Sequence, residues 1–345
     1  MTAPIRVGLT RDFLKPDGSL GFGDIGLDVL KCDPRIVTEF LPDFGSELPP
    51  SVGHDFDAIV ALAPRISAKT LDGATHLAII ARFGVGYDSV DVEACTRNDI
   101  LLTITPSGVR RPVAVSALTL LLALSHKLLI KDRLTREGRW ADKLHHMGVG
   151  LTGRTLGLIG LGNIGREVLK MVAPLEMKHV AYDPFVTPDS ARASGVELLD
   201  LDALLEQSDF VCVCCALTPE THHLLNTERL GRMKPSAFLI NVARGPIVDQ
   251  AALTQCLQAG RIAGAGLDVF EKEPIEPSDP LLKLDNVIVA PHAICWTDEL
   301  FHGIGQSACR SIVEAAAGRI PPDVVNRDVI NSAGLQAKLA ALASK

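Results

Sequence analysis

The sequence lacks the features that mark several other classes of protein. Its formal net charge is −7, with acidic and basic residues interspersed, so it has no basic stripe for nucleic acid. The opening stretch MTAPIRVGLT contains one Arg and no apolar h-region, so we see no secretory signal. The longest apolar stretch, residues 113–130, is interrupted by Ser125, His126 and Lys127, which fits a buried helix better than a membrane span. We therefore expect a soluble, cytoplasmic protein without a nucleic-acid or membrane partner.

Disulfide and metal-binding patterns are also missing. The eight cysteines lie at irregular spacings and include no CxxC pair. Cys212, Cys214 and Cys215 belong to the apolar stretch FVCVCCAL, which favours reduced thiols in a buried strand over disulfides or metal ligands. The histidine pairs at 145–146 and 222–223 are adjacent residues, which do not converge on one face of a helix. We predict no metal site.

Two α/β patterns are present instead. With 345 residues, 47% of them hydrophobic, the chain can form about two globular domains. From residue 155 onward, β-rich apolar runs begin near positions 155, 179, 210, 237, 262 and 286, with helical patterns in several of the gaps. Strands that are apolar throughout and alternate with helices predict a doubly wound parallel sheet. Before residue 110, five shorter runs (IRVGLT, RIVTEFL, FDAIVALAP, LAIIARF and LLTIT) predict a smaller, flavodoxin-like α/β domain.

A dinucleotide-binding fingerprint lies in the second pattern. The strand TLGLI precedes Gly160, Gly162 and Gly165, a helical pattern follows, and Asp183 ends the next strand. Gly160 permits a tight turn, Gly162 lets the backbone approach a pyrophosphate, and Gly165 lets helix and strand pack closely. The N-terminus of the following helix attracts the phosphates. Asp183 can accept hydrogen bonds from a ribose and repels a 2′-phosphate, which favours NAD over NADP.

The order of the patterns predicts that this Rossmann domain is inserted into the other domain. A long helix is expected over residues 111–140, with Pro112 at its start and Gly138 beyond its end. The helical pattern at 298–319 has no sheet of its own to cover, so we expect it to return to the first domain. The predicted parts are a substrate domain (1–110 plus 297–330), a nucleotide domain (111–296) and a C-terminal tail (331–345).

Polar residues follow three apolar strands of the nucleotide domain. Arg244 follows FLIN, Asp268 and Glu273 lie in GLDVFEKEP, and His292 follows VIVAP. Ligands of such sheets bind at the carboxyl ends of the strands, so these side chains are candidates for one site. An Arg that grips a carboxylate and a His oriented by a carboxylate suit carbonyl reduction. Taken singly, Arg244 could cap a strand, Glu273 could be solvated and His292 could be a buried structural residue.

The motifs together resemble the D-isomer-specific 2-hydroxyacid dehydrogenases over nearly the whole chain. The resemblance rests on FGVGYDSVD, TPSGVRRPVA, GLGNIG, MKPSAFLINVARGPIVD, GLDVFEKEP and APH, in that order. It implies an NAD-dependent oxidoreductase that transfers hydride between nicotinamide and C2 of a small D-2-hydroxy acid or 2-keto acid. In such an enzyme His292 protonates the keto oxygen, Glu273 holds His292 charged and oriented, and Arg244 binds the substrate carboxylate. It also implies a homodimer formed through the region of the long helix.

The same resemblance implies further ligand contacts. The N–H groups of Val85 and Gly86 are expected to bind the other carboxylate oxygen, and Asp268 the nicotinamide carboxamide. The remaining expected cofactor contacts are the backbone of Asn163 and Ile164 and a loop at the adenosine side with Thr218, Pro219 and Thr221.

Three features depart from common members of this family. Val115 stands where Glu is frequent. The segment AICWTDE (293–299) replaces a small, Gly-containing stretch, and Trp296 in it either shapes the substrate pocket or packs the returning helix. A Gly-rich loop at 14–26 either closes over the substrate or is an inert surface loop.

Several alternative functions remain open at this point. Formate and phosphite dehydrogenases share the fold, and the Trp296 segment argues mildly for a larger substrate than theirs. A phosphoglycerate-type dehydrogenase without a regulatory domain would want extra basic residues, which Arg82, Arg110 and Arg111 can supply. An NAD-sensing scaffold, similar to corepressors that resemble this family, would show little turnover and a peptide-docking groove in the first domain.

Overall fold

Two parallel sheets form the framework, one in each of two units. The computed structural model describes residues 3–345, so residues 1 and 2 of the predicted substrate domain lie outside it. The first unit runs to Val109 and resumes at Trp296, and the second unit is Arg110–Cys295. The fold class, a Rossmann-type unit inserted into a flavodoxin-like one, is confirmed.

The first unit contains a sheet of five parallel strands in the order β2-β1-β3-β4-β5, the flavodoxin-like order. Its strands are β1 (Ile5–Leu9), β2 (Ile36–Phe40), β3 (Ala58–Ala61), β4 (Ile79–Arg82) and β5 (Leu101–Thr103). Its helices are α1 (Pro50–Asp55), α2 (Ala68–Leu71), α3 (Val92–Arg97), α11 (Asp298–Ala316) and α12 (Ala333–Ser344).

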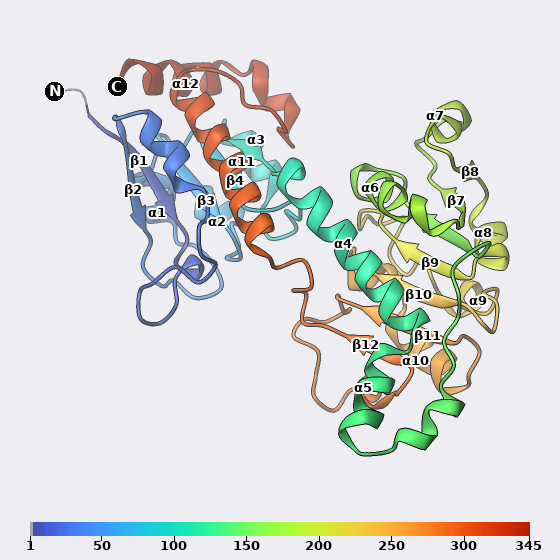
Figure 1. The fold of residues 1–345 in the computed structure, drawn as a ribbon. Helices are drawn as coiled ribbons and strands as arrows, with labels where there is room; N and C mark the ends of the chain where they lie inside the picture. The colour runs from blue at the N-terminus through green and yellow to red at the C-terminus, as the bar shows by residue number, and fades with distance from the viewer. Residues whose placement is uncertain (1–2) are drawn as a thin grey trace. The chain divides into compact units, whose positions relative to one another are not determined.

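Of the last two helices of the chain, α11 packs against β3 and β4, and α12 packs against α11 (Figure 1). In α11, a Cβ at Gly305 would lie 1.8 Å from the carbonyl oxygen of Ile25, which belongs to the loop after β1. The helix therefore approaches this loop more closely than a residue other than glycine allows. Residues 331–345, which we expected to be a separate tail, belong to the first unit. Helix α12 makes up most of this segment and buries Leu335, Leu339 and Leu342.

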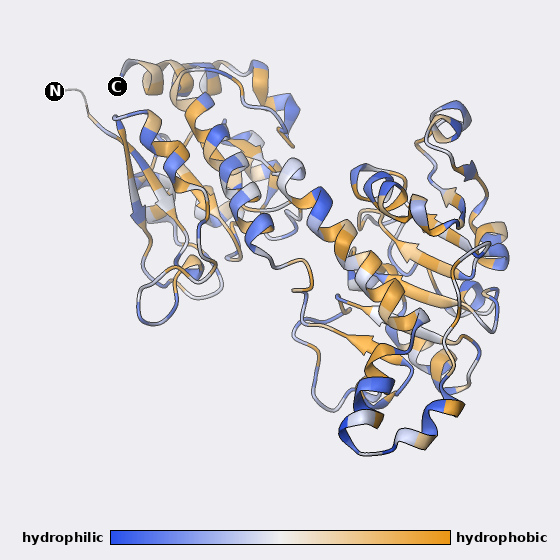
Figure 2. Cartoon of the chain, in the orientation of Figure 1, coloured by the Kyte–Doolittle hydropathy of each residue, from blue (hydrophilic) through white to orange (hydrophobic). Residues whose placement is uncertain are grey.

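The second unit contains seven parallel strands in the order β12-β11-β10-β9-β6-β7-β8. They are β6 (Thr155–Ile159), β7 (Lys178–Tyr182), β8 (Glu197–Leu198), β9 (Phe210–Val213), β10 (Phe238–Asn241), β11 (Gly264–Leu267) and β12 (Val287–Val289). The order is that of a Rossmann fold with β12 added, and it reverses between β6 and β9, where such folds bind dinucleotides. Its strands are mostly apolar, as expected for a sheet covered on both faces (Figure 2). The two-residue strand β8 is too short to have been predicted from an apolar run.

The remaining helices either begin or cover the second unit. They are α4 (Pro106–Ser125), α5 (Leu128–Arg136), α6 (Asn163–Val172), α7 (Pro188–Ala193), α8 (Leu201–Gln207), α9 (Thr227–Leu230) and α10 (Gln250–Gln258). The single long helix expected over 111–140 is wrong in two respects. Helix α4 begins at Pro106, so Pro112 lies inside it, and Lys127 adopts the left-handed conformation (φ 52°), which separates α4 from α5.

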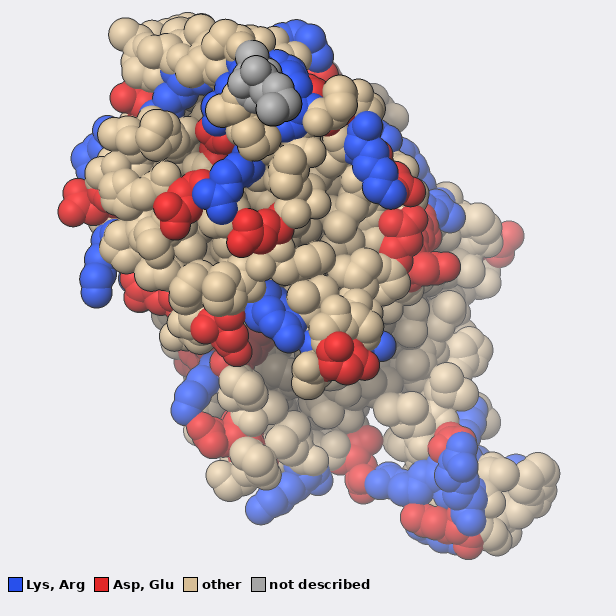
Figure 3. Space-filling view, turned by 90° about the vertical axis from the view of Figure 1, so that its left-hand side faces the viewer, with Lys and Arg blue, Asp and Glu red and all other residues tan. Residues whose placement is uncertain are grey.

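Helix α4 is long and apolar enough to cross a membrane by length and composition alone. Half of its apolar window is buried in the protein, and Leu120 and Leu124 pack directly over Gly266 in β11. A core helix passes the same test, and these contacts identify α4 as one. Charged side chains of both signs are interspersed over the face shown in Figure 3.

Candidate active site

The three glycines of the fingerprint build a turn between β6 and α6. Gly160 has φ +99°, and a Cβ there would lie 2.6 Å from the backbone nitrogen of Cys215. A Cβ at Gly165 would lie 2.3 Å from the Gly160 carbonyl oxygen, so the first turn of α6 packs directly on the loop. A Cβ at Gly162 would meet nothing within 4 Å, so the backbone there faces open space. Two of the glycines therefore serve close packing, and the third leaves room for a ligand.

The N-terminus of α6 provides the polar part of this cradle. Among the described residues no side chain caps the helix at Gly162, so the N–H groups of Asn163 and Ile164 are available to an anion. A pyrophosphate fits this combination of free donors, positive helix potential and open space above Gly162.

Asp183 lies at the end of β7, next to the glycine turn. Its two carboxylate oxygens accept backbone hydrogen bonds from Leu161 (2.8 Å) and Phe185 (2.9 Å). These bonds fix the carboxylate beside the turn, and each oxygen keeps a lone pair for a ribose hydroxyl.

The loop after β9 contains the predicted adenosine-side residues. Thr221 Oγ1 donates to the Ala216 carbonyl at 2.7 Å and accepts from the Thr218 N–H at 2.7 Å. The Thr221 hydroxyl therefore stabilises the conformation of the turn that contains Pro219. Cys215, at the start of the same loop, lies directly behind Gly160, so this loop borders the glycine turn.

Arg244, Asp268, Glu273 and His292 follow neighbouring strands, as the sequence predicts. Arg244 comes after β10, Asp268 and Glu273 come after β11, and His292 comes after β12. These three strands are adjacent and parallel, so their carboxyl ends share one edge of the sheet.

His292 and Glu273 form a direct pair. Nδ1 of His292 donates to Glu273 Oε2 at 2.8 Å, which leaves Nε2 for another partner. His292 has φ +55°, an uncommon conformation for a residue other than glycine and one often found at functional sites. The other oxygen of Glu273 accepts from the Phe270 N–H at 3.0 Å.

The charge of Glu273 is set by opposing effects. Burial raises the pKa of this carboxyl, and the hydrogen bonds from His292 and Phe270 lower it. The charges of His292 and Arg244 lower it further, and the net pKa lies below the ordinary value of 4.5. Glu273 is therefore a carboxylate at neutral pH.

Asn241, the last residue of β10, is a site residue that the sequence analysis did not single out. Its side chain is buried, donates to the Arg244 carbonyl at 3.0 Å and accepts from the Ala243 N–H at 3.0 Å. Asn241 thus shapes the loop that carries Arg244. The only signal in the sequence is an amide at the end of an apolar strand, just before a candidate arginine.

Asp268 is buried and binds the segment that follows His292. Its carboxylate accepts hydrogen bonds from the N–H groups of Ala293 (2.9 Å) and Ile294 (3.3 Å). Burial raises the pKa of Asp268 above its usual value despite these bonds and the nearby charge of His292. Asp268 therefore holds the backbone of the two residues that follow His292, a role that the sequence did not predict.

Val85, Gly86 and Trp296 belong to the first unit. Within residues 3–345, the N–H groups of Val85 and Gly86 donate no hydrogen bond, so both remain available to an anion. Trp296 lies edge-on to Phe22 (ring centroids 5.3 Å apart) and to Phe301 of α11 (5.5 Å). Trp296 thus packs the returning helix, while 52% of its surface stays exposed.

The loop at 14–26 is attached to α11 in this structure. Phe22 stacks on Phe301 with ring centroids 4.3 Å apart, and Asp24 accepts a hydrogen bond from His302 at 3.0 Å. Val115, the other departure from the family pattern, is exposed on α4, and nothing in the structure explains it.

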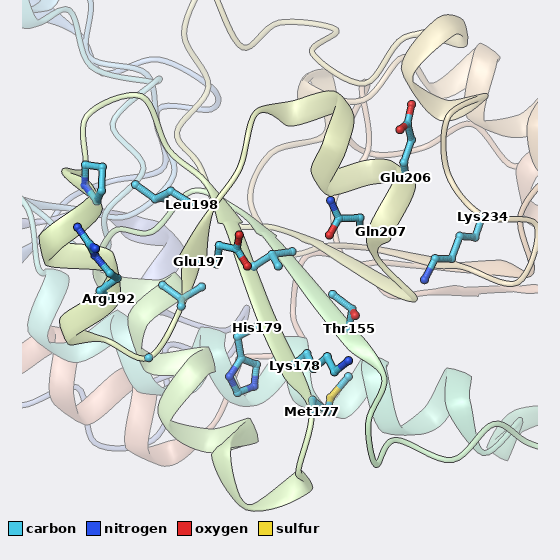
Figure 4. A pocket seen from close by; sticks show the side chains of 14 residues that line it. Thr155, Met177, Lys178, His179, Arg192, Glu197, Leu198, Glu206, Gln207 and Lys234 are labelled. Carbon is cyan, nitrogen blue, oxygen red and sulfur yellow. The ribbon is translucent and has the colours of Figure 1, made fainter.

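A hollow of about 1300 Å³ in the second unit lies away from Arg244, Glu273 and His292. Thr155 and Lys178, the first residues of β6 and β7, line it, so it lies at the opposite edge of the sheet (Figure 4). In the part of the chain that the structure describes, no three His, Cys, Asp or Glu side chains gather closely enough to hold a metal ion.

Comparisons with known proteins identify the family of this chain. Residues 118–293 match the family model described as D-isomer specific 2-hydroxyacid dehydrogenase, NAD binding domain. A glyoxylate reductase from Korarchaeum cryptofilum is 42% identical over 280 residues, 80% of this chain and 84% of that protein. A D-3-phosphoglycerate dehydrogenase from Archaeoglobus fulgidus is 41% identical over 79% of this chain and 51% of its own length.

A solved structure shows the same fold. The TT0316 protein from Thermus thermophilus aligns with a TM-score of 0.81 at 33% identity, over 93% of this chain and 99% of that one. The chain therefore belongs to the D-isomer-specific 2-hydroxyacid dehydrogenases, a family of NAD(P)-dependent oxidoreductases.

Proposed function

We propose that this enzyme reduces a small 2-keto acid to the D-2-hydroxy acid with NADH, and that His292 is its acid and base. Glyoxylate is the first substrate to test, because relatives at about 40% identity are named glyoxylate reductase. The observation that carries the proposal is the His292–Glu273 hydrogen bond at the sheet edge where Arg244 and the glycine turn also lie.

Each of the three residues has a defined task in this proposal. Glu273, a carboxylate at neutral pH, orients the imidazole so that His292 Nε2 protonates the keto oxygen. Bound NADH supplies the hydride to C2. Arg244 grips the substrate carboxylate with two parallel hydrogen bonds and polarises the carbonyl. In the reverse direction His292 takes the hydroxyl proton.

Further ligand contacts remain predictions. The free N–H groups of Val85 and Gly86 support their role in binding a carboxylate oxygen. Asp268 keeps carboxylate lone pairs for the nicotinamide carboxamide while it holds the segment after His292. The exposed face of Trp296 supports a contact with the substrate side chain.

We further propose that the enzyme prefers NAD to NADP. The fixed carboxylate of Asp183 can accept hydrogen bonds from both ribose hydroxyls, whereas a 2′-phosphate would meet a negative charge.

The experiment is a screen of NADH oxidation by the purified protein against 2-keto acids of increasing size, with NADPH in parallel. His292→Gln is expected to abolish turnover and to leave NADH affinity near wild type. Arg244→Lys loses the bidentate grip and is expected to lower kcat/KM by on the order of 10² or more. Wild-type kinetics in either variant would refute the assigned roles.

The phosphoglycerate-type alternative has one relative in its favour and one structural observation against it. Arg110 and Arg111, considered for a phosphate site, lie 3.4 and 3.6 Å from the buried carboxylate of Glu167. Both guanidinium groups are therefore ion-paired with Glu167 within the second unit. Phosphohydroxypyruvate belongs in the substrate panel as the direct test. A protein that binds NADH but oxidises it with no keto acid would instead favour the scaffold alternative.

We also propose a homodimer. Helix α5 and the following residues to 147 carry several exposed apolar side chains: Leu128, Leu129, Trp140, Leu144 and Met147. Exposed apolar side chains gathered in one segment of the chain support an interface. The double variant Leu144→Asp/Met147→Asp is expected to elute as a monomer in size-exclusion chromatography with light scattering, whereas a wild-type monomer would refute the dimer. Eight free thiols support a reducing compartment such as the cytoplasm.

A further inference from the structure

Two glutamates of one short segment each bind a histidine. Glu273 binds His292, and Glu271, two residues earlier, pairs with Nε2 of His223. Both histidines have positive φ, +55° for His292 and +49° for His223. A strained backbone conformation is retained where the surrounding structure enforces it, so the second pair requires an explanation of its own.

The second pair connects three loops. His223 lies in the loop after β9, and its N–H donates to the Pro246 carbonyl in the loop after β10 at 2.8 Å. Glu271 lies in the loop after β11. Gln250, the first residue of α10, donates its N–H to Glu271 Oε2 (3.2 Å) and accepts from the Glu271 N–H with Oε1 (3.1 Å). We call His223, Glu271 and Gln250 the loop clamp.

The loop clamp belongs to the same loops as the groups assigned to the reaction. Pro246 is two residues from Arg244, and Glu271 is two residues from Glu273. The loop that carries His223 also contains Cys215, which packs behind the glycine turn. The clamp therefore joins the loops that carry Arg244, Glu273 and the border of the cofactor site.

We propose that His223 is a positioning residue: its side chain, through Glu271, fixes the separation of the loops that carry Arg244 and Glu273. The inference rests on the proposed function of those two residues. The side chains of His223 and Glu271 are 37% and 31% exposed, so their pairing contributes little to global stability. Its effect is expected in the geometry of the reacting groups, which tolerates far less error than folding does.

The test compares two neighbouring histidines. His223→Asn keeps a residue that tolerates positive φ but is too short to reach Glu271. His222→Asn is the matched control, because within residues 3–345 the His222 side chain makes no hydrogen bond and stacks on His223, with ring centroids 4.1 Å apart. We expect His223→Asn to lower kcat for keto-acid reduction roughly tenfold, since displacements below 1 Å already impair catalysis. NADH affinity is expected to stay within about twofold and the melting temperature within about 2 °C of the control. Glu271→Gln retains hydrogen-bonding capacity, so its kcat is expected to fall less than that of His223→Asn.

A double variant separates positioning from general damage. If His223 acts through Arg244, then His223→Asn/Arg244→Lys is no slower than Arg244→Lys alone, because the grip that needed positioning is already lost. Additive losses, a kcat equal to that of the His222→Asn control, or a fall in melting temperature that accounts for the lost activity would each overturn the inference. A fully active Arg244→Lys would overturn the proposed function and the inference together, whereas an impaired Arg244→Lys beside an unaffected His223→Asn overturns the inference alone.

Discussion

Gly245 sets the distance between the Arg244 loop and the Glu273 loop, and Gly245→Ala is the sharpest test of the site. A Cβ at this position would lie 1.9 Å from both the carbonyl carbon and the carbonyl oxygen of Phe270, and 2.5 Å from the nitrogen of Glu271. These atoms belong to the backbone, so no side-chain rotation relieves the clash.

The required displacement follows from ordinary contact distances. Non-bonded heavy atoms pack at about 3.5–4.0 Å, so one of the two loops must retreat by roughly 1.5–2 Å. Glu273 moves with Phe270, because the Phe270 N–H is bonded to its carboxylate at 3.0 Å. Misplacement by about 1 Å typically costs on the order of 10² in rate, so we expect kcat/KM to fall at least 10²-fold. Overpacking of this kind also lowers the free energy of unfolding by about 1–3 kcal/mol.

The assay is steady-state reduction of the best keto acid, together with NADH titration and thermal unfolding. Gly150→Ala is the matched control, since a Cβ there meets nothing within 4 Å. Gly162→Ala is expected to affect cofactor binding and not stability. The added Cβ meets no protein atom within 4 Å but enters the space assigned to the pyrophosphate, so the variant weakens NADH binding without destabilising the fold. A Gly245→Ala enzyme with kcat/KM within twofold of Gly150→Ala would refute the reasoning, because the loops would then tolerate the displacement.

Three further predictions test other parts of the molecule. Asp183→Ala removes the charge that opposes a 2′-phosphate, so the ratio of kcat/KM for NADPH over NADH is expected to rise roughly tenfold or more; an unchanged ratio places discrimination elsewhere. Asn241→Ala leaves the Ala243 N–H and the Arg244 carbonyl without their buried partner. Calorimetry is expected to show that the free energy of unfolding falls by about 1–3 kcal/mol, and kcat/KM is expected to fall as well. Burial lowers the pKa of Lys338 to about 8 from 10.5. Between those pH values the unfolded chain binds more protons than the folded one, so stability rises with pH. The melting temperature of wild type relative to Lys338→Met should therefore increase from pH 8 to pH 10, and a constant difference would contradict the shifted pKa.

The fold could be predicted from the sequence because its signals are local and repeated. Apolar runs bounded by helical patterns marked nearly all of the strands, and the glycine fingerprint marked the turn after β6. The errors lie where a tertiary contact overrides the local signal. Pro112 resembles a helix start, yet Pro106 begins α4, and the break after it comes from the left-handed Lys127. Nothing in the residue type of Lys127 indicates that conformation.

The C-terminal residues illustrate the same limit. Residues 331–345 carry no motif, so no local pattern joins them to a domain. In the structure, the Lys338 amine donates hydrogen bonds to the carbonyls of Ala74, Leu77 and Asn98 at 2.6–3.0 Å. A lysine on a helix is usually a solvated residue, and only the packing of α12 on the first unit reveals that it satisfies buried acceptors.

The candidate site divides along a similar line. Arg244, Glu273 and His292 could be named from the sequence because the proposed chemistry needs those residue types, and each follows a recognisable strand. Asn241, Gly245 and the loop clamp take no part in the proposed chemistry, so their residue types do not identify them in the sequence.

These supporting residues set distances instead. A glycine that permits a 1.9 Å approach, or an amide that closes one turn, looks the same in the sequence as its counterparts elsewhere. Substrate preference in this enzyme is expected to depend on such residues, since the acid, the base and the carboxylate grip serve every 2-keto acid alike. Variants of the residues that set loop spacing are therefore a more direct route to changed specificity than variants of the catalytic residues themselves.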